Sequence, residues 1–131
     1  MGCIEKAGTS EIVEVLSYGE TVPTNQNERG VYALNAPGND LIAATALAAS
    51  GCQIVLFTTG RGTPFSSFVP TMKISSNSRI AKHKNNWIDF DAYGMDENGL
   101  FDLLMKAING EYICKSEDIR EIAFYKTGVT L

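Results

Sequence analysis

The stretch Leu56-Phe57-Thr58-Thr59-Gly60-Arg61-Gly62-Thr63-Pro64-Phe65 passes from a buried-strand pattern to a loop of glycines, threonines and one arginine. With Ile54 and Val55 before it, the apolar part is a run without polar alternation, which is typical of parallel strands covered on both faces. We predict a strand over 53–58. The loop after it can gather backbone and hydroxyl donors around a small anion. The stretch therefore predicts an α/β fold with an anion-binding loop at the rim of its sheet.

The segments around this stretch alternate between helix and strand patterns. We predict further strands over 31–35, 72–75, 87–90 and 122–125, and helices over 11–18, 41–50, 78–84 and 97–109. Ser10 is the expected N-cap of the first helix and Asp40 that of the second. Residues 20–30 are polar and turn-rich, and predict a surface loop. The order indicates a single α/β domain over residues 1–131, with a mostly parallel sheet, flanking helices and a Rossmann-like three-layer arrangement.

Composition narrows the class of protein. The 131 residues fit one domain, and 44% hydrophobic residues are enough for a core. A formal net charge of −4 argues against broad nucleic-acid binding, and no apolar run is long enough to cross a membrane. The N-terminus lacks the apolar core of a signal peptide. Three distant cysteines, Cys3, Cys52 and Cys114, form no C-x-x-C pair, so we expect a cytoplasmic protein without a disulfide framework.

Polar clusters follow four of the predicted strands, over 35–40, 58–62, 75–78 and 89–91. In open α/β sheets, ligands bind outside the carboxyl ends of the strands. Clusters on one edge would form a pocket rich in hydroxyls and amides, which suits a polyhydroxylated anion. The alternative is that each cluster holds ordinary turn and cap residues, since Gly, Asn, Asp and Ser are common there.

Individual residues carry further hypotheses. Arg61, between two glycines, can bind a carboxylate or phosphate through its guanidinium, or pair with an acid at the surface. Its loop lacks the Gly-Lys-Ser/Thr ending of a Walker A motif and the third glycine of a dinucleotide motif. Asp89 and Asp91 lie two apart on a strand, and either bind a hard cation or do acid–base work, or form a solvated edge. His83, between two lysines, is expected at the surface, with a catalytic role as the alternative. Lys73 is a candidate base or electrophile, or points outward.

Several of these segments together resemble the altronate dehydratase / galactarate dehydratase family, and the resemblance covers nearly the whole chain. The segments that carry it are Asn35-Ala36-Pro37-Gly38-Asn39-Asp40, 56–65, 69–78, Trp87-Ile88-Asp89-Phe90-Asp91-Ala92, 120–123 and Gly128-Val129-Thr130-Leu131. The chain looks like the C-terminal domain of that family. The resemblance implies an enzyme that removes water from a sugar acid to give a 2-keto-3-deoxy acid, with a divalent metal, typically iron(II).

The resemblance also implies roles for the polar residues. Arg61 and the backbone amides of the loop would bind the substrate carboxylate, and Asn39, Asp40 and Asn77 would bind hydroxyls. Asp89 is a candidate ligand for the metal or for the substrate, and the catalytic base is not identified. The full set expected to contact the sugar acid is Asn39, Asp40, Thr58, Thr59, Gly60, Arg61, Gly62, Lys73 and Asn77.

The chain departs from the family in two ways. Where members usually carry Asp-Phe/Ile-Asn-Ala-Gly, this chain has Asp89-Phe90-Asp91-Ala92-Tyr93, which adds charge and bulk and bears on substrate choice. Family enzymes are several hundred residues long, so we expect an upstream domain, in the same or a separate chain, and little turnover by this domain alone. A homodimer of the protein is one possible assembly. The alternative function is a non-catalytic α/β module that binds anions or a protein partner, and a third is a phosphate- or nucleotide-binding domain.

Overall fold

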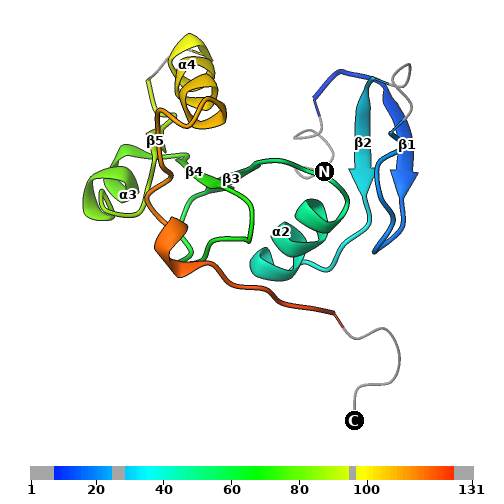
Figure 1. Cartoon of the computed structure of the whole chain (residues 1–131). Coiled ribbons are helices and arrows are strands. Elements are labelled where there is room, and N and C mark those ends of the chain that lie inside the picture. Colours follow the sequence, from blue (N-terminus) through cyan, green and yellow to red (C-terminus); the bar gives the residue numbers. More distant parts are fainter. Residues whose placement is uncertain (1–7, 25–28, 95–96, 126–131) are drawn as a thin grey trace.

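A computed structural model describes residues 8–24, 29–94 and 97–125 of the chain (Figure 1). Its strands are β1 (Ile12–Leu16), β2 (Val31–Leu34), β3 (Val55–Thr59), β4 (Thr71–Ser75) and β5 (Phe90–Asp91). Its helices are α2 (Asp40–Ala49), α3 (Ser78–His83), α4 (Glu97–Ile108) and the short 3₁₀ helix η1 (Glu117–Ile119). Among these residues no helix is long and apolar enough to cross a bilayer. The last motif of the resemblance, 128–131, lies outside the described residues.

Strands β3, β4 and β5 form one parallel sheet in that order. Leu56 pairs with Met72 and Phe57 with Lys73, so the two faces of the sheet follow directly from the register. One face carries Leu56, Thr58, Met72 and Ile74, and the opposite face carries Val55, Phe57, Thr59, Thr71, Lys73 and Ser75. All five residues of β4 are buried, as expected of a central parallel strand.

Helices pack on both faces of this sheet, and on the α4 face they cover β4 but leave Leu56 and Thr58 of β3 exposed. On one face, Ala44 of α2 packs with Val55 and Phe65, and Leu41 and Leu47 lie against them. On the other face, Leu100, Leu103 and Ala107 of α4 pack against Met72 and its buried neighbours. The predicted α/β class, with parallel strands between helices, is therefore confirmed. The alanines of α2 let its backbone approach the sheet closely, because Ala44, Ala46 and Ala48 are all buried.

The first predicted helix, 11–18, is wrong. Residues 12–16 form β1, which pairs with β2 in a separate two-stranded parallel sheet. Three β-branched residues, Ile12, Val13 and Val15, favour a strand over a helix because their side chains lose rotamer freedom in helical turns. Pairing with β2, which a local pattern does not reveal, makes this segment a strand and not a helix.

The predicted strand over 122–125 is also wrong, because this segment has no strand neighbour in the described part of the chain. It runs as an extended tail fixed at separate points: Glu121 N–H donates to the carbonyl of Ser66 (2.8 Å) and Ala123 N–H to Oγ1 of Thr45 (3.3 Å). Figure 1 shows the chain after α4 returning across the sheet before this tail begins.

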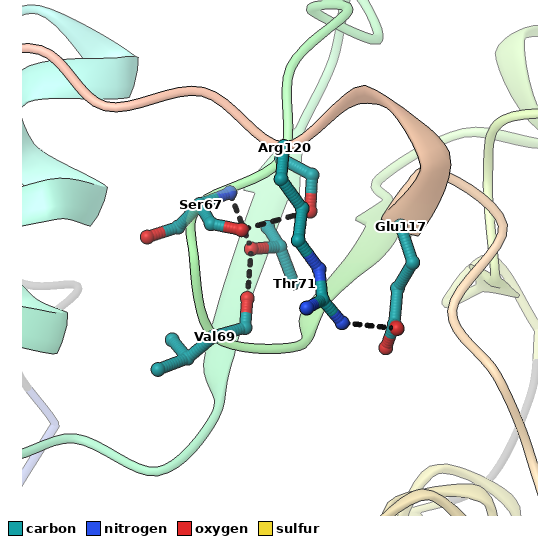
Figure 2. Close-up of polar contacts among 6 residues, drawn as sticks. Ser67, Val69, Thr71, Glu117 and Arg120 are labelled. Carbon is teal, nitrogen blue, oxygen red and sulfur yellow. Dashed lines mark hydrogen bonds and ion pairs between the residues drawn. The ribbon is translucent and has the colours of Figure 1, made fainter.

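The turn that the tail crosses is held by its own polar contacts (Figure 2). Ser67 N–H donates to Oγ1 of Thr71 (3.0 Å), whose hydroxyl donates to the carbonyl of Val69 (3.1 Å). Beside it, Arg120 forms an ion pair with Glu117 at 2.6 Å. Ser67 and Thr71 have no exposed surface, so these bonds satisfy buried groups that water cannot reach.

Smaller differences concern element ends. The predicted strand 87–90 is reduced to the two residues of β5, with Trp87 and Ile88 in a turn closed on the carbonyl of Lys84. Asn39, and not Asp40, caps α2, since its Oδ1 accepts from Ile42 N–H at 3.2 Å. Of the predicted loop 20–30, residues 20–24 and 29–30 have no helix or strand, and 25–28 lie outside the described residues.

Candidate functional site: a basic pocket at the carboxyl edge of the sheet

The loop after β3 is closed by the last residue of the strand. Thr59 Oγ1 accepts hydrogen bonds from the backbone N–H groups of Arg61 (3.2 Å) and Gly62 (2.8 Å). Gly62 has a φ of +70°, a conformation that favours glycine. The backbone amides of Arg61 and Gly62, which we expected to bind a substrate carboxylate, therefore donate to a side chain of the loop itself.

Two side chains from α3 and the turn after it hold the carbonyl side of the loop. Lys84 Nζ donates to the carbonyl oxygens of Arg61 and Gly62, each at 2.8 Å. Trp87 Nε1 donates to the carbonyl of Thr63 at 3.1 Å. A Cβ on Gly62 would lie 2.8 Å from Cδ of Lys84, so the lysine fits only against glycine. The loop is therefore a rigid rim rather than an open cradle.

Lys73 fixes the far end of the same loop from inside the domain. Its side chain has no exposed surface, and Nζ donates to the carbonyl of Phe65. The ammonium also lies 4.7 Å from the ring centre of Phe65 and 4.8 Å from that of Trp87. Burial lowers the pKa of Lys73 to about 8, while the Asp89 carboxylate opposes this shift and Lys84 adds to it. Lys73 does not point outward, as one interpretation of the sequence had it.

The pocket beside this rim has a volume of about 380 Å³ and is lined by Gly60, Asn77, Arg79, Ile80 and His83. Arg79 and His83 are four residues apart on α3 and so share one face of the helix. Within the described residues, neither side chain has a hydrogen bond or ion pair, and no acidic residue lines the pocket. The Arg79 guanidinium and the His83 imidazole thus line one cavity with their donors unused, beside the Asn77 carboxamide.

The structure brings some of the predicted residues to this edge and gives several of them structural bonds. Asn77 caps α3 by accepting from Ile80 N–H (2.9 Å), and its Nδ2 donates to the carbonyl of Gly60 (3.4 Å). Asp40 accepts from the hydroxyl of Thr63 at 2.9 Å, which ties the start of α2 to the loop. Gly60 and Asn77 line the pocket, whereas Asn39 and Asp40 line a separate cavity beside α2.

Two further predicted residues lie near the pocket without lining it. Arg61 is exposed, next to Gly60 in the chain. Thr58 is exposed on the α4 side of β3, the face opposite to Thr59. Their contacts with a sugar acid stay predictions, as do those of the other seven residues in the set.

Asp89 is surrounded by protein donors. Its Oδ2 accepts from the backbone N–H of Lys73 (2.7 Å), and its Oδ1 accepts from the Tyr112 hydroxyl and the Lys115 N–H, both at 2.8 Å. The described residues hold no group of three His, Cys, Asp or Glu side chains that could bind a metal ion. This donor set does not fit a divalent cation on its own.

Arg79 is a pocket residue that the sequence did not identify, and His83 is one for which it favoured simple surface exposure over a catalytic role. His83 was correctly expected to be exposed, but exposure does not exclude lining an open pocket. A signal was present: Arg79 and His83 have the i, i+4 spacing of one helix face, immediately after a polar strand end.

The fold and this pocket define the protein as a parallel α/β domain with a basic pocket at the carboxyl edge of its sheet. Residues 1–130 match the family model described as D-galactarate/altronate dehydratase, C-terminal, and the chain belongs to that family.

Relatives agree with this assignment. Over the whole chain it is 47% identical to an altronate dehydratase of Escherichia coli and 45% identical to one of Bacillus subtilis. Over 68% of the chain it is 41% identical to a galactarate dehydratase (L-threo-forming) of Escherichia coli, of which the match covers 16%. The chain spans 28% of the length of each altronate dehydratase.

Proposed function

We propose that this chain is the C-terminal domain of a sugar-acid dehydratase that converts an altronate- or galactarate-like acid into a 2-keto-3-deoxy acid. Family membership over nearly the whole chain is the observation that carries the proposal. The names of the relatives supply the substrate class. The basic, acid-free lining of the Arg79 pocket supports it, because such a lining suits a carboxylate.

The pocket residues fit the chemistry of this reaction. A base removes the proton at C2, next to the carboxylate, and the C3–O bond breaks as the hydroxyl leaves as water. The resulting enol becomes the 2-keto acid. Negative charge builds up on the carboxylate when the proton leaves, so a guanidinium bound there stabilises the transition state more than the substrate. We assign this role to Arg79, with Asn77 Nδ2 and the rim as hydrogen-bonding partners for hydroxyls.

His83 is placed to exchange a proton at the same cavity, because an imidazole serves as either donor or acceptor. We propose it as the group that protonates the departing hydroxyl. Arg61, exposed beside Gly60, provides a second cation for the other end of an aldarate. Iron(II) dependence and a cytoplasmic location stay proposals for the full-length protein, and further residues of that protein complete any metal site.

The test is an assay of the full-length protein that contains this chain, with altronate and galactarate as substrates and the neutral alditols of the same stereochemistry as controls. 2-Keto acid formation should occur with one or both acids when iron(II) is present, fall on chelation, and be absent with the alditols. Absence of turnover with every sugar acid tried, in protein that is folded and iron-loaded, would reject the dehydratase function.

A further inference from the structure

The face of the sheet that α4 covers is only half closed. Met72 and Ile74 of β4 are 0% and 5% exposed beneath α4. Leu56, their neighbour on β3 and on the same face, is 43% exposed, and Thr58 beyond it is exposed as well. Parallel strands normally have both faces covered, so the β3 half of this face lacks its cover.

An apolar groove occupies the uncovered half. It has a volume of about 380 Å³ and runs between Leu56 and α4, where Leu100, Phe101 and Leu104 form its apolar wall. Glu97 and Asn98 are its polar lining residues. The groove is thus built from the sheet on one side and a helix on the other.

Helix α4 continues this apolar surface beyond the groove. Phe101, Met105 and Ile108 are 60%, 39% and 58% exposed and follow one another at the spacing of a single helix face. No residue of α4 is fully buried, although its opposite face packs on the core through Leu100, Leu103 and Ala107. An apolar stripe joined to an apolar groove is larger than the scattered exposed side chains of an ordinary monomer.

We propose that the groove and stripe, made of Leu56, Leu100, Phe101, Leu104, Met105 and Ile108, dock the part of the dehydratase that lies upstream of this domain. The altronate dehydratases are matched over only 28% of their length, and the family model describes the C-terminal part, so most of such a protein precedes the matched region. That portion is the occupant, and it places an apolar helix or strand edge over Leu56.

The position of the groove gives this docking a consequence for the basic pocket. Both lie on the same β3–β4 unit: Leu56 is in β3, and Gly60, which lines the basic pocket, follows the end of that strand. Upstream residues that dock over Leu56 would therefore lie next to the strand that leads directly into the Thr59–Gly62 rim. The inference depends on family membership and not on the proposed dehydration, so the two can fail separately.

The test uses the full-length protein and the 131-residue chain, each carrying Phe101→Cys. Maleimide labelling at residue 101, followed by peptide mass spectrometry, should be at least about tenfold slower in the full-length protein than in the chain alone. Asp102→Cys is the matched control, because it is exposed on the polar side of the same helix and should react equally in both. Equal labelling rates at position 101 in the two proteins would overturn the proposal.

A second measurement identifies what covers the groove. A photoactivatable benzophenone attached at position 101, or at Leu56→Cys on the other wall, should cross-link to peptides from the upstream part of the full-length protein. Cross-links to residues 1–131 of a second copy would instead assign this face to a homodimer and reject the upstream domain as its occupant. Neither readout needs catalytic activity.

Discussion

The three-stranded sheet β3–β4–β5 and the two-stranded pair β1–β2 are both parallel, yet they are built on different principles. In the first, β4 has no exposed residue, and helices pack over it on both faces. In the second, four of the five residues of β1 are exposed, including Ile12, Val13 and Val15. Polar contacts also concentrate in the first region, where Asp89 and Lys73 fix backbone groups. Stability should therefore depend on the first region and tolerate change in the second.

The largest effect is expected at Asp89, which accepts three hydrogen bonds from Lys73, Tyr112 and Lys115. Asp89→Ala leaves these donors unpaired and should lower the free energy of unfolding by about 3 kcal/mol. Asp102→Ala, an exposed carboxylate on α4, is the control and should change it by less than about 0.5 kcal/mol. Urea titration of both variants without added metal measures the difference. A stable Asp89→Ala would mean that the carboxylate is not structural.

The second-largest effect should come from Lys73, through the pH dependence of the free energy of unfolding. Its pKa is lowered in the folded state, so between about pH 8 and 10 the unfolded chain binds more protons and stability rises with pH. Burial raises the pKa of Cys114, to about 12, and that of Tyr112, so these groups reduce stability at higher pH. Because Lys73→Met keeps Cys114 and Tyr112, subtracting the curve of this variant removes their contribution to the pH dependence. Relative to the variant, the wild type should gain about 2 kcal/mol between pH 8 and 10; parallel curves would contradict a buried amine.

A pair of glycines tests the rigidity of the rim. Gly62→Ala forces a side chain into a positive φ and against Lys84, and should cost about 1.5 kcal/mol. Gly60→Ala, where the new Cβ meets only Ser76 Oγ at 3.4 Å, should cost less than about 0.5 kcal/mol. Thermal unfolding of the two variants gives the comparison, and equal Tm values would show that Lys84 does not hold the loop.

The smallest effect is expected in the β1–β2 pair. Val15 is 66% exposed, so Val15→Thr keeps the β-branched shape and removes little buried surface. The free energy of unfolding should change by less than about 0.5 kcal/mol in the 131-residue chain. A loss above about 1 kcal/mol would show that β1 is as tightly packed as β4 and would remove the contrast between the two regions.

The same contrast explains what the sequence could predict. Around β3, α2, β4 and α4, the pattern gave elements within a few residues of their bounds, because burial on both faces leaves continuous apolar runs. It failed at 11–18 and 122–125, where the outcome depends on whether a partner strand lies alongside. The alternative that Lys73 points outward fails for a related reason: β4 is covered on both sides and has no outward side, so a lysine on it must be buried.

The candidate site shows a similar division. Polar clusters at strand ends correctly led to Gly60 and Asn77, which line the pocket. In the structure Asn39 caps a helix and Asp89 fixes backbone groups, a role that uses the same residue types as ligand binding, so their predicted ligand contacts stay predictions. Arg79 and His83 required the position of α3 relative to the loop, which depends on packing that a single sequence does not display.

The most direct test of the central claim compares two cations on α3 in the full-length protein, in an assay of the proposed dehydration. Arg79 lines the pocket, whereas Lys82 is exposed on the same helix and does not. With altronate or galactarate, whichever is turned over, Arg79→Gln should lower kcat/KM at least about 100-fold, as expected for loss of a charge that stabilises the developing anion. Lys82→Gln should leave kcat/KM unchanged. Equal kcat/KM values for the two variants would contradict a carboxylate site in this pocket.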